Sequence, residues 1–126
     1  MKTIYAAFIL IAVIFVFCLC FDIMVKSDVD SITAKIERMN RLTRASDYLE
    51  AGAVFSEIEN EWRKKEKYLQ IMTEHGELDA INEQLAAIRA SYRNNEYDSI
   101  FQHIYTLDYF INHIYEKKIV NISTIL

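Results

Sequence analysis

The chain begins with one long apolar run, and its remainder repeats apolar residues at helical spacing. The run from Ile4 to Phe21 contains no charged residue. As a helix with a rise of ~1.5 Å per residue it would span roughly 27 Å, close to the thickness of the hydrocarbon core of a bilayer. The pattern therefore predicts a membrane-spanning helix over residues 4–21.

Four amphipathic segments follow this run. In each, apolar residues recur mostly at steps of three and four, which predicts a helix with one buried face. Phe101, Tyr105, Phe110 and Tyr115 widen the face of the fourth, so we expect it to be buried against two neighbours. Lys65 interrupts the second face and is expected to turn outwards to water. The recurring positions are, segment by segment, Val25, Val29, Ile32, Ile36 and Met39; Ala51, Phe55, Ile58, Trp62, Leu69 and Met72; Leu78, Ile81, Leu85, Ile88 and Tyr92; and Ile100, Ile104, Leu107, Ile111 and Ile114.

Polar residues and one glycine mark the ends of these helices. Asp47, with Glu50 three residues later, is typical of a helix N-terminus and predicts a break near residue 46. The stretch Thr73–Asp79, "TEHGELD", contains Gly76, which we expect in a left-handed turn, and Asp79, which favours the start of the next helix. A further stop is expected at residues 94–95, where two asparagines adjoin. Short connections of this kind predict antiparallel neighbours.

Composition supports an all-α fold. The 126 residues include no proline and two glycines, and 52% of them are hydrophobic. We predict a transmembrane signal anchor over residues 1–25, a helical stalk over residues 26–46, and an antiparallel bundle with a short C-terminal tail over residues 47–126. The bundle has three helices in this division. The stalk either packs as a fourth helix or runs on into the second, because a strict hairpin of the expected lengths would reach the bilayer.

The apolar run is interpreted as an uncleaved anchor. A cleaved signal peptide has a shorter apolar region that ends in small residues, whereas residues 15–21 are bulky throughout. Cys18 and Cys20 are interpreted as apolar side chains within lipid. Since only Lys2 and the amino terminus precede the run, we expect a single-pass cell-membrane protein with a cytoplasmic N-terminus and an extracytoplasmic C-terminal domain.

Charge and motifs argue against several functions. The net charge of -4 does not favour nucleic-acid binding, which requires a concentrated basic face. The chain lacks a glycine-rich phosphate loop, a Cys-x-x-Cys pair and the sequence patterns of zinc proteases and serine hydrolases. We therefore expect neither enzymatic activity nor a cofactor. The basic residues Lys35, Arg38, Arg41 and Arg44 are interpreted as surface charge, the alternative being contact with anionic lipid or a polyanionic wall polymer.

Two histidines are candidate metal ligands. In a hairpin centred between residues 94 and 95, residues whose numbers sum to about 189 lie level, so His75 is level with Ile114, and His113 and Glu116 lie close by. Imidazole and carboxylate groups together can bind a divalent metal. The favoured interpretation is structural, with His75 ending a helix and hydrogen-bonding across the bundle end, because the paired motifs of di-iron bundles are absent.

The chain resembles a known bacterial family. The resemblance rests on Trp62, on the stretch from Glu74 to Ile81 ("EHGELDAI"), on "HIYE" from His113, and on the terminal Ile125–Leu126. These features resemble domain-of-unknown-function family 4363, whose members are small single-span proteins, over residues 45–126 and the general plan of the anchor. The resemblance implies a membrane-anchored helical protein and provides no catalytic residues.

We therefore predict an extracytoplasmic, membrane-tethered interaction or scaffold protein. Its expected partners are the lipid bilayer, through residues 4–21, and another membrane or cell-envelope protein, and a homo-oligomer is compatible with the pattern. Trp62, His75, Gly76 and Asp79 are the expected structural or interaction residues, and the tyrosines at positions 68, 97 and 109 are candidate interface residues. The alternative is a sensor-like bundle that binds a metal or ligand at the His75–His113 end.

Overall fold

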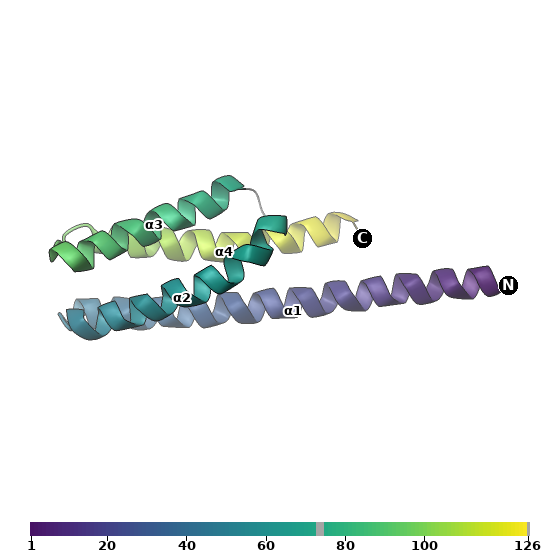
Figure 1. Ribbon diagram of the computed structural model, residues 1–126, viewed down its shortest axis with the longest axis horizontal. Helices are drawn as coiled ribbons and strands as arrows, with labels where there is room; N and C mark the ends of the chain where they lie inside the picture. Colours follow the sequence, from purple (N-terminus) through teal and green to yellow (C-terminus); the bar gives the residue numbers. More distant parts are fainter. Residues whose placement is uncertain (73–74, 126) are drawn as a thin grey trace.

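A computed structural model of the chain contains four α-helices, and no strand occurs among the residues that it describes (Figure 1). It describes the backbone of residues 1–72 and 75–125 and the side chains of residues 1–71 and 75–114. The expected all-α fold is confirmed. The helices are α1 (Lys2–Arg44), α2 (Tyr48–Met72), α3 (His75–Asn94) and α4 (Ile100–Ile125).

Helix α1 is an unbroken helix of 43 residues whose two halves have different surroundings. The side chains of residues 1–20 are exposed, and from Val25 to Thr43 one face of the helix is buried against other helices. Figure 1 shows the N-terminal half projecting beyond the rest of the molecule. Within the described residues, α1 is the one helix that is long and apolar enough to cross a membrane, a property that signal sequences share.

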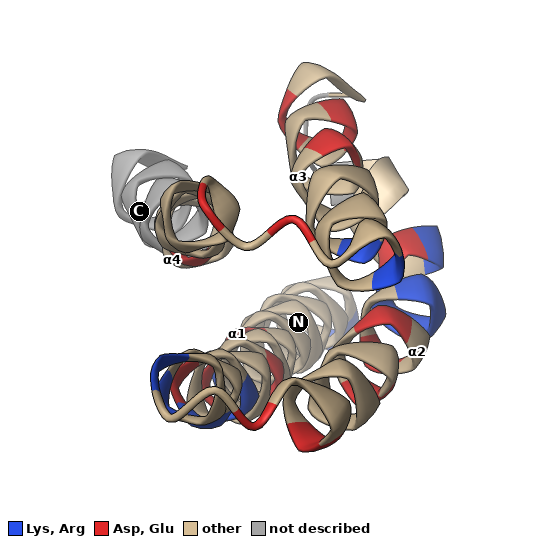
Figure 2. Cartoon of the chain, turned by 90° about the vertical axis from the view of Figure 1, so that its left-hand side faces the viewer, with Lys and Arg blue, Asp and Glu red and all other residues tan. Residues whose placement is uncertain are grey.

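The other half of α1 is part of the bundle. It packs against α2 and α4, and α3 closes the arrangement by packing against α4 and α2 (Figure 2). The segment 26–46, which the sequence assigned to a stalk, is thus the first of four bundle helices. The hairpin fits because α2 has 25 residues and a length of roughly 37 Å, which brings its end level with the end of the apolar run.

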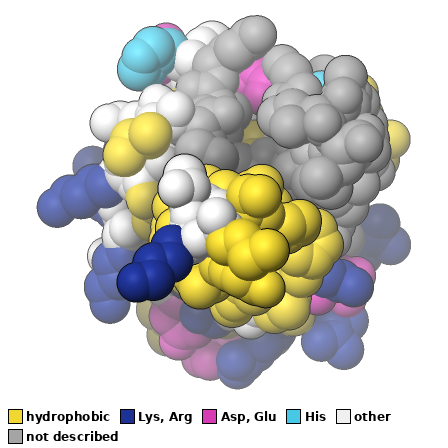
Figure 3. Space-filling view, turned by 90° about the vertical axis from the view of Figure 1, so that its right-hand side faces the viewer, with side chains coloured by type: hydrophobic (Ala, Val, Ile, Leu, Met, Phe, Trp, Pro, Cys, Tyr) yellow, Lys and Arg dark blue, Asp and Glu magenta, His cyan; other side chains and the backbone are white. Residues whose placement is uncertain are grey.

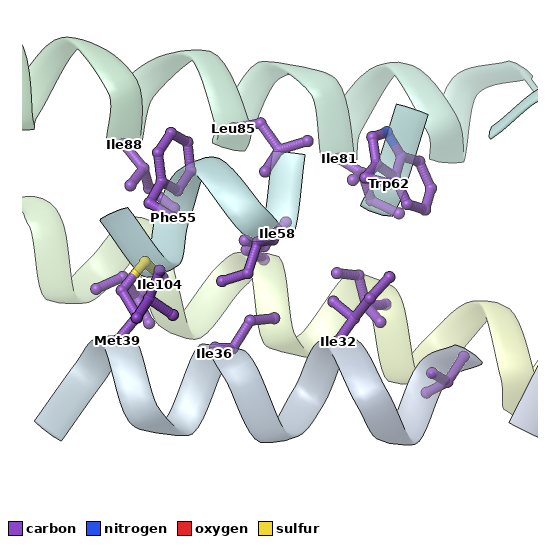
Figure 4. Close-up of a cluster of buried hydrophobic side chains, with 14 of the residues drawn as sticks. Ile32, Ile36, Met39, Phe55, Ile58, Trp62, Ile81, Leu85, Ile88 and Ile104 are labelled. Carbon is purple, nitrogen blue, oxygen red and sulfur yellow. The ribbon is translucent and has the colours of Figure 1, made fainter. Parts of the chain in front are cut away.

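The predicted apolar faces form the core. Every recurring apolar position with a described side chain is buried apart from Tyr92, which is half-buried (Figure 4). The side chains of Met72 and Tyr115 lie outside the described residues. The expected broad burial of α4 is wrong at Phe101 and Tyr105, which are 39% and 74% exposed. Helix α4 does contact two neighbours, but Ile104 and its equivalents at steps of three and four are enough to make those contacts.

The break between α1 and α2 confirms the expected cap. Ser46 has a φ of 62°, and the Asp47 backbone N–H donates a hydrogen bond of 2.9 Å to the Leu42 carbonyl, as in a Schellman motif. The Asp47 carboxylate then accepts a hydrogen bond of 3.4 Å from the Glu50 N–H and so caps α2. A single tight turn therefore reverses the chain.

The expected role of Gly76 is wrong. No described glycine has a positive φ, and Gly76 lies in the first turn of α3. The second left-handed residue is instead Asn95, with a φ of 55°, which ends α3. The stop expected at residues 94–95 is confirmed, and helix α4 begins at Ile100. Asparagine adopts this conformation more readily than other non-glycine residues, because its short polar side chain bonds locally.

We expect Gly76→Ala to increase the free energy of unfolding by ~0.5–1 kcal/mol, because Gly76 is helical and a Cβ there would meet no atom within 4 Å. Asn95→Ala should instead lower it by about 1 kcal/mol, since alanine tolerates the left-handed region poorly. Urea titrations of the full chain in detergent, followed by circular dichroism, would measure both. A loss of stability in Gly76→Ala would contradict the helical assignment.

Candidate functional site

Of the candidate metal ligands, His113 has described contacts. His113 lies across from Glu77, with 3.7 Å between Nε2 and Oε1, and its ring stacks on Tyr109 at a centroid distance of 5.8 Å. This agrees with the predicted register of α3 and α4. His75, however, is exposed, and the Glu116 side chain lies outside the described residues. Among the described side chains, no three of the His, Cys, Asp and Glu type are grouped as a metal site requires.

Asp79 and His103 lie near the same end of the bundle, and their neighbours belong to the bundle itself. Asp79 is exposed in the second turn of α3, and Leu78 beside it is buried in the core. His103 Nδ1 lies 2.8 Å from Gln84 Oε1, which joins α4 to α3 one level further along. His113 and His103 therefore both link α3 and α4.

Trp62 links α2 to α3. Its side chain is 3% exposed, and Nε1 donates a hydrogen bond of 2.9 Å to Asn82 Oδ1. The Asn82 amide in turn donates to Glu66 Oε1 at 2.8 Å. A buried indole N–H requires a partner, and Asn82 provides it. The residue that most strongly supports the family resemblance thus has a packing role.

A polar cluster joins α1 to α2 near the end of the apolar run. The Asp28 carboxylate accepts hydrogen bonds from the Lys65 ammonium and from the Tyr68 hydroxyl. The expectation that Lys65 turns outwards is therefore wrong, because Asp28 gives its charge a partner at the helix interface. Tyr68, expected to be exposed, is half-buried, and Phe21 lies edge-on to its ring at a centroid distance of 6.3 Å.

Two tyrosines and one aspartate have shifted pKa values with clear causes. Burial and the hydrogen bond to Asp28 raise the pKa of Tyr68 well above that of free tyrosine. Burial likewise raises the pKa of Tyr92, whose hydroxyl lies 2.8 Å from Thr43 Oγ1. Burial raises the pKa of Asp108 on α4, and the nearby charge of Glu37 on α1 adds to this effect.

The basic residues of α1 are largely paired within the bundle. Lys35 forms an ion pair of 2.6 Å with Glu61, Arg38 lies 3.5 Å from Glu50, and the Arg44 guanidinium lies over the Phe101 ring. These contacts favour the interpretation as surface charge. The pairs with exposed side chains contribute little to stability individually.

A groove separates α2 from α3 in the half of the bundle furthest from the apolar run. It has a volume of about 300 Å³, and Figure 2 shows Lys and Arg segments of the two helices side by side there. We call it the distal groove. Its lining residues are Gly52, Phe55, Ser56, Glu59, Asn60 and Arg63 from α2 and Arg89, Tyr92 and Arg93 from α3.

The charges of the distal groove are partly compensated. Arg89 donates hydrogen bonds from Nε and Nη2 to the Glu59 carboxylate, and this pairing raises the pKa of Arg89. Arg63 lies 3.5 Å from the same carboxylate, and Arg93 forms no ion pair with any described residue. One carboxylate against three guanidinium groups leaves the groove positive, which suits an acidic partner.

Sequence analysis did not identify this groove. On the α2 side the groove is lined by Gly52 and Ser56, which are small and lie one turn apart. That spacing of small residues was the signal for a groove that the sequence offered. The arginines belong to mixed charge runs that resemble an ordinary solvated surface. Their assembly depends on how α2 and α3 pack, which spacing within either helix does not reveal.

We expect Tyr68→Phe to lower the free energy of unfolding by about 1.5–3 kcal/mol at pH 7, because the hydrogen bond to the Asp28 carboxylate is lost. Since the pKa of Tyr68 is raised on folding, the wild-type stability from this group is complete below the unfolded pKa of about 10 and falls as pH rises beyond it. The difference between wild type and variant should therefore narrow above pH ~10. Urea titrations from neutral to alkaline pH would test this, with Tyr105→Phe controlling for loss of an exposed hydroxyl; a constant difference would contradict it.

Comparison with known proteins gives one match. A family model described as domain of unknown function (DUF4363) matches residues 21–125. No curated protein and no solved structure matches the chain. The match begins earlier than the resemblance over residues 45–126 and includes the packed half of α1, in agreement with a bundle of four helices. The chain therefore belongs to the DUF4363 family of domains of unknown function.

Proposed function

We propose that this protein is a membrane-tethered interaction or scaffold module, without enzymatic activity, whose bundle lies outside the cytoplasm. The observation that supports this proposal is the division of α1 into an exposed apolar half and a half buried in the bundle. Side chains such as Phe8, Ile9 and Phe17, 65–70% exposed, would be costly to leave in water. Lipid is the environment that such a helix surface requires.

The continuity of α1 would also fix the bundle relative to the bilayer. A helix without a flexible linker passes directly from the anchor into the bundle at Val25, so the bundle cannot move freely around its attachment. Such rigidity suits a protein that presents a surface at a set distance from the membrane. The distal groove is the surface that we propose for the partner.

The distal groove has the properties of a binding surface for a protein. Tyr92, which is half-buried and whose ring lies against the buried Phe55, provides apolar area, and Arg63 and Arg93 provide charge. Aromatic residues and arginine are enriched in protein–protein interfaces. We propose that an acidic segment of another membrane or envelope protein binds there. The alternative is a second copy of the chain, which would give a crosslinked product of a different mass.

We expect a cysteine at Leu49, which is 91% exposed at the far end of the bundle, to react with a membrane-impermeant maleimide in intact cells. A cysteine at Lys2 should react only after the cells are permeabilised, because the chain would cross the membrane between these positions. Both variants require Cys18→Ser and Cys20→Ser, since these cysteines are free. The reverse labelling pattern would place the bundle in the cytoplasm, and release of the bundle into the medium would indicate a cleaved signal peptide.

We expect a photo-crosslinking residue at Ser56, in the distal groove, to give a specific product in native membranes. The same residue at Tyr105, which is 74% exposed on α4, serves as the matched control and should not give that product. Arg93→Glu should lower the yield at Ser56 by repelling an acidic partner. A product of twice the chain mass would identify a homo-oligomer, and equal products from both positions would contradict a role for the groove.

A further inference from the structure

We propose that the end of the bundle nearest the anchor, formed by the C-terminus of α2 and the start of α3, sits in the headgroup layer of the bilayer that α1 spans. Ile71 would then insert among the lipids, and Lys26 and Lys67 would meet anionic headgroups. This inference rests on the proposed anchoring of α1 and extends it, because it assigns a second lipid-contacting surface outside the span. We call this surface the proximal end.

The register of α1 and α2 brings the proximal end to the edge of the apolar run. Lys65 and Tyr68 both contact Asp28, and the Tyr68 ring lies against Phe21, the last residue of the run. Ile71 lies one turn beyond Tyr68 towards the anchor. Since the two helices are antiparallel, Ile71 lies about level with Asp22, the first charged residue after the run.

Exposed apolar side chains occur at this level. Ile71, in the last turn of α2, is 82% exposed. On α1, Ile23 is 70% and Met24 is 44% exposed, beyond the predicted span. Isolated exposed apolar residues are common on protein surfaces. Here they continue the lipid-facing surface of the anchor, which identifies lipid as their partner.

Lysines lie where headgroups would be. Lys26 and Lys67 are exposed and lie about one turn, or ~5.4 Å, further from the anchor than Asp22 and Ile71 respectively. The headgroup region on each side of a bilayer is roughly 5–7 Å thick, so both ammonium groups would lie within it. Figure 3, which looks along α1 from its N-terminal end, shows Lys and Arg side chains around the edge of the molecule behind the apolar helix.

Acidic groups face this region as well. Asp28 is neutralised by Lys65, Glu66 accepts a hydrogen bond from Asn82, and Glu77 lies against His113. Asp22 is half-buried at about the level of Ile71, and Asp30 is exposed about two turns further from the apolar run. Asp79 is exposed and lies about level with Tyr68, because the contacts of Asn82 with α2 set the register of α3. On each of α1 and α2 the exposed charged residue nearest to the apolar run is a lysine, which would attract anionic lipid.

The test places spin labels on the full chain in vesicles of phosphatidylcholine and phosphatidylglycerol. In a background with Cys18→Ser and Cys20→Ser, single cysteines replace Ile71, Leu49 or Ile14. Leu49 is the matched control, because it is an equally exposed aliphatic residue at the opposite end of the same helix. For each label, power saturation measures collisions with oxygen, which concentrates in lipid, and with a nickel chelate, which stays in water. We expect the ratio of oxygen to nickel collisions to rise from Leu49 to Ile71 to Ile14.

The outcomes separate this inference from the anchoring proposal. Equal ratios at Ile71 and Leu49, with a high ratio at Ile14, would overturn the inference and leave the anchor intact. A low ratio at Ile14 would overturn the anchor itself. Low collision rates with both reagents at Ile71 would indicate a protein partner and also overturn the inference.

A second experiment tests the lysines. Lys26→Gln combined with Lys67→Gln should lower the ratio of oxygen to nickel collisions at Ile71. Arg41→Gln, which removes an exposed cation of α1 far from the anchor, should not lower it, and equal effects would overturn the role of headgroup charge.

Discussion

The continuity of α1 is the constraint on which the rest of the structure depends. One helix carries an exposed apolar surface in its first half and a buried face in its second, with no change of backbone conformation between them. Helices α2 and α4 pack against that buried face, and α3 packs against both of them. Because Val25, Val29 and Ile32 must be covered close to where the apolar run ends, the bundle is built immediately beside the anchor rather than at the tip of a stalk.

Polar contacts within the bundle set the pairing of helices more than they create chemistry. Asp28 joins α1 to α2 through Lys65 and Tyr68, Trp62 joins α2 to α3 through Asn82, and Glu77 faces His113 between α3 and α4. Each pair lies at the edge of the apolar core, where a mismatched register would leave a buried polar group without a partner. These polar contacts therefore specify how the helices align at three of the four helix interfaces. In the sequence, the same residue types look like candidate site residues.

Two surfaces remain after these contacts are assigned, one at each end of the bundle. The distal groove presents arginine side chains and Tyr92 away from the apolar run, and the proximal end presents Ile71 and lysines towards it. Such a division fits a module that holds a fixed position on a membrane at one end and contacts a partner at the other.

The sequence by itself determined the helical class, the apolar run and the buried faces, because these follow from residue spacing along one helix, and even the register of α3 on α4 followed from a short connection. It also determined the Asp47 cap, which involves neighbours in the chain. Only the tertiary structure decided that α1 is the fourth bundle helix, that Lys65 pairs with Asp28, and that Gly76 is helical while Asn95 is left-handed. These features depend on which helix covers which face, and free energies of packing between segments distant in the chain are not encoded in the periodicity of either segment alone.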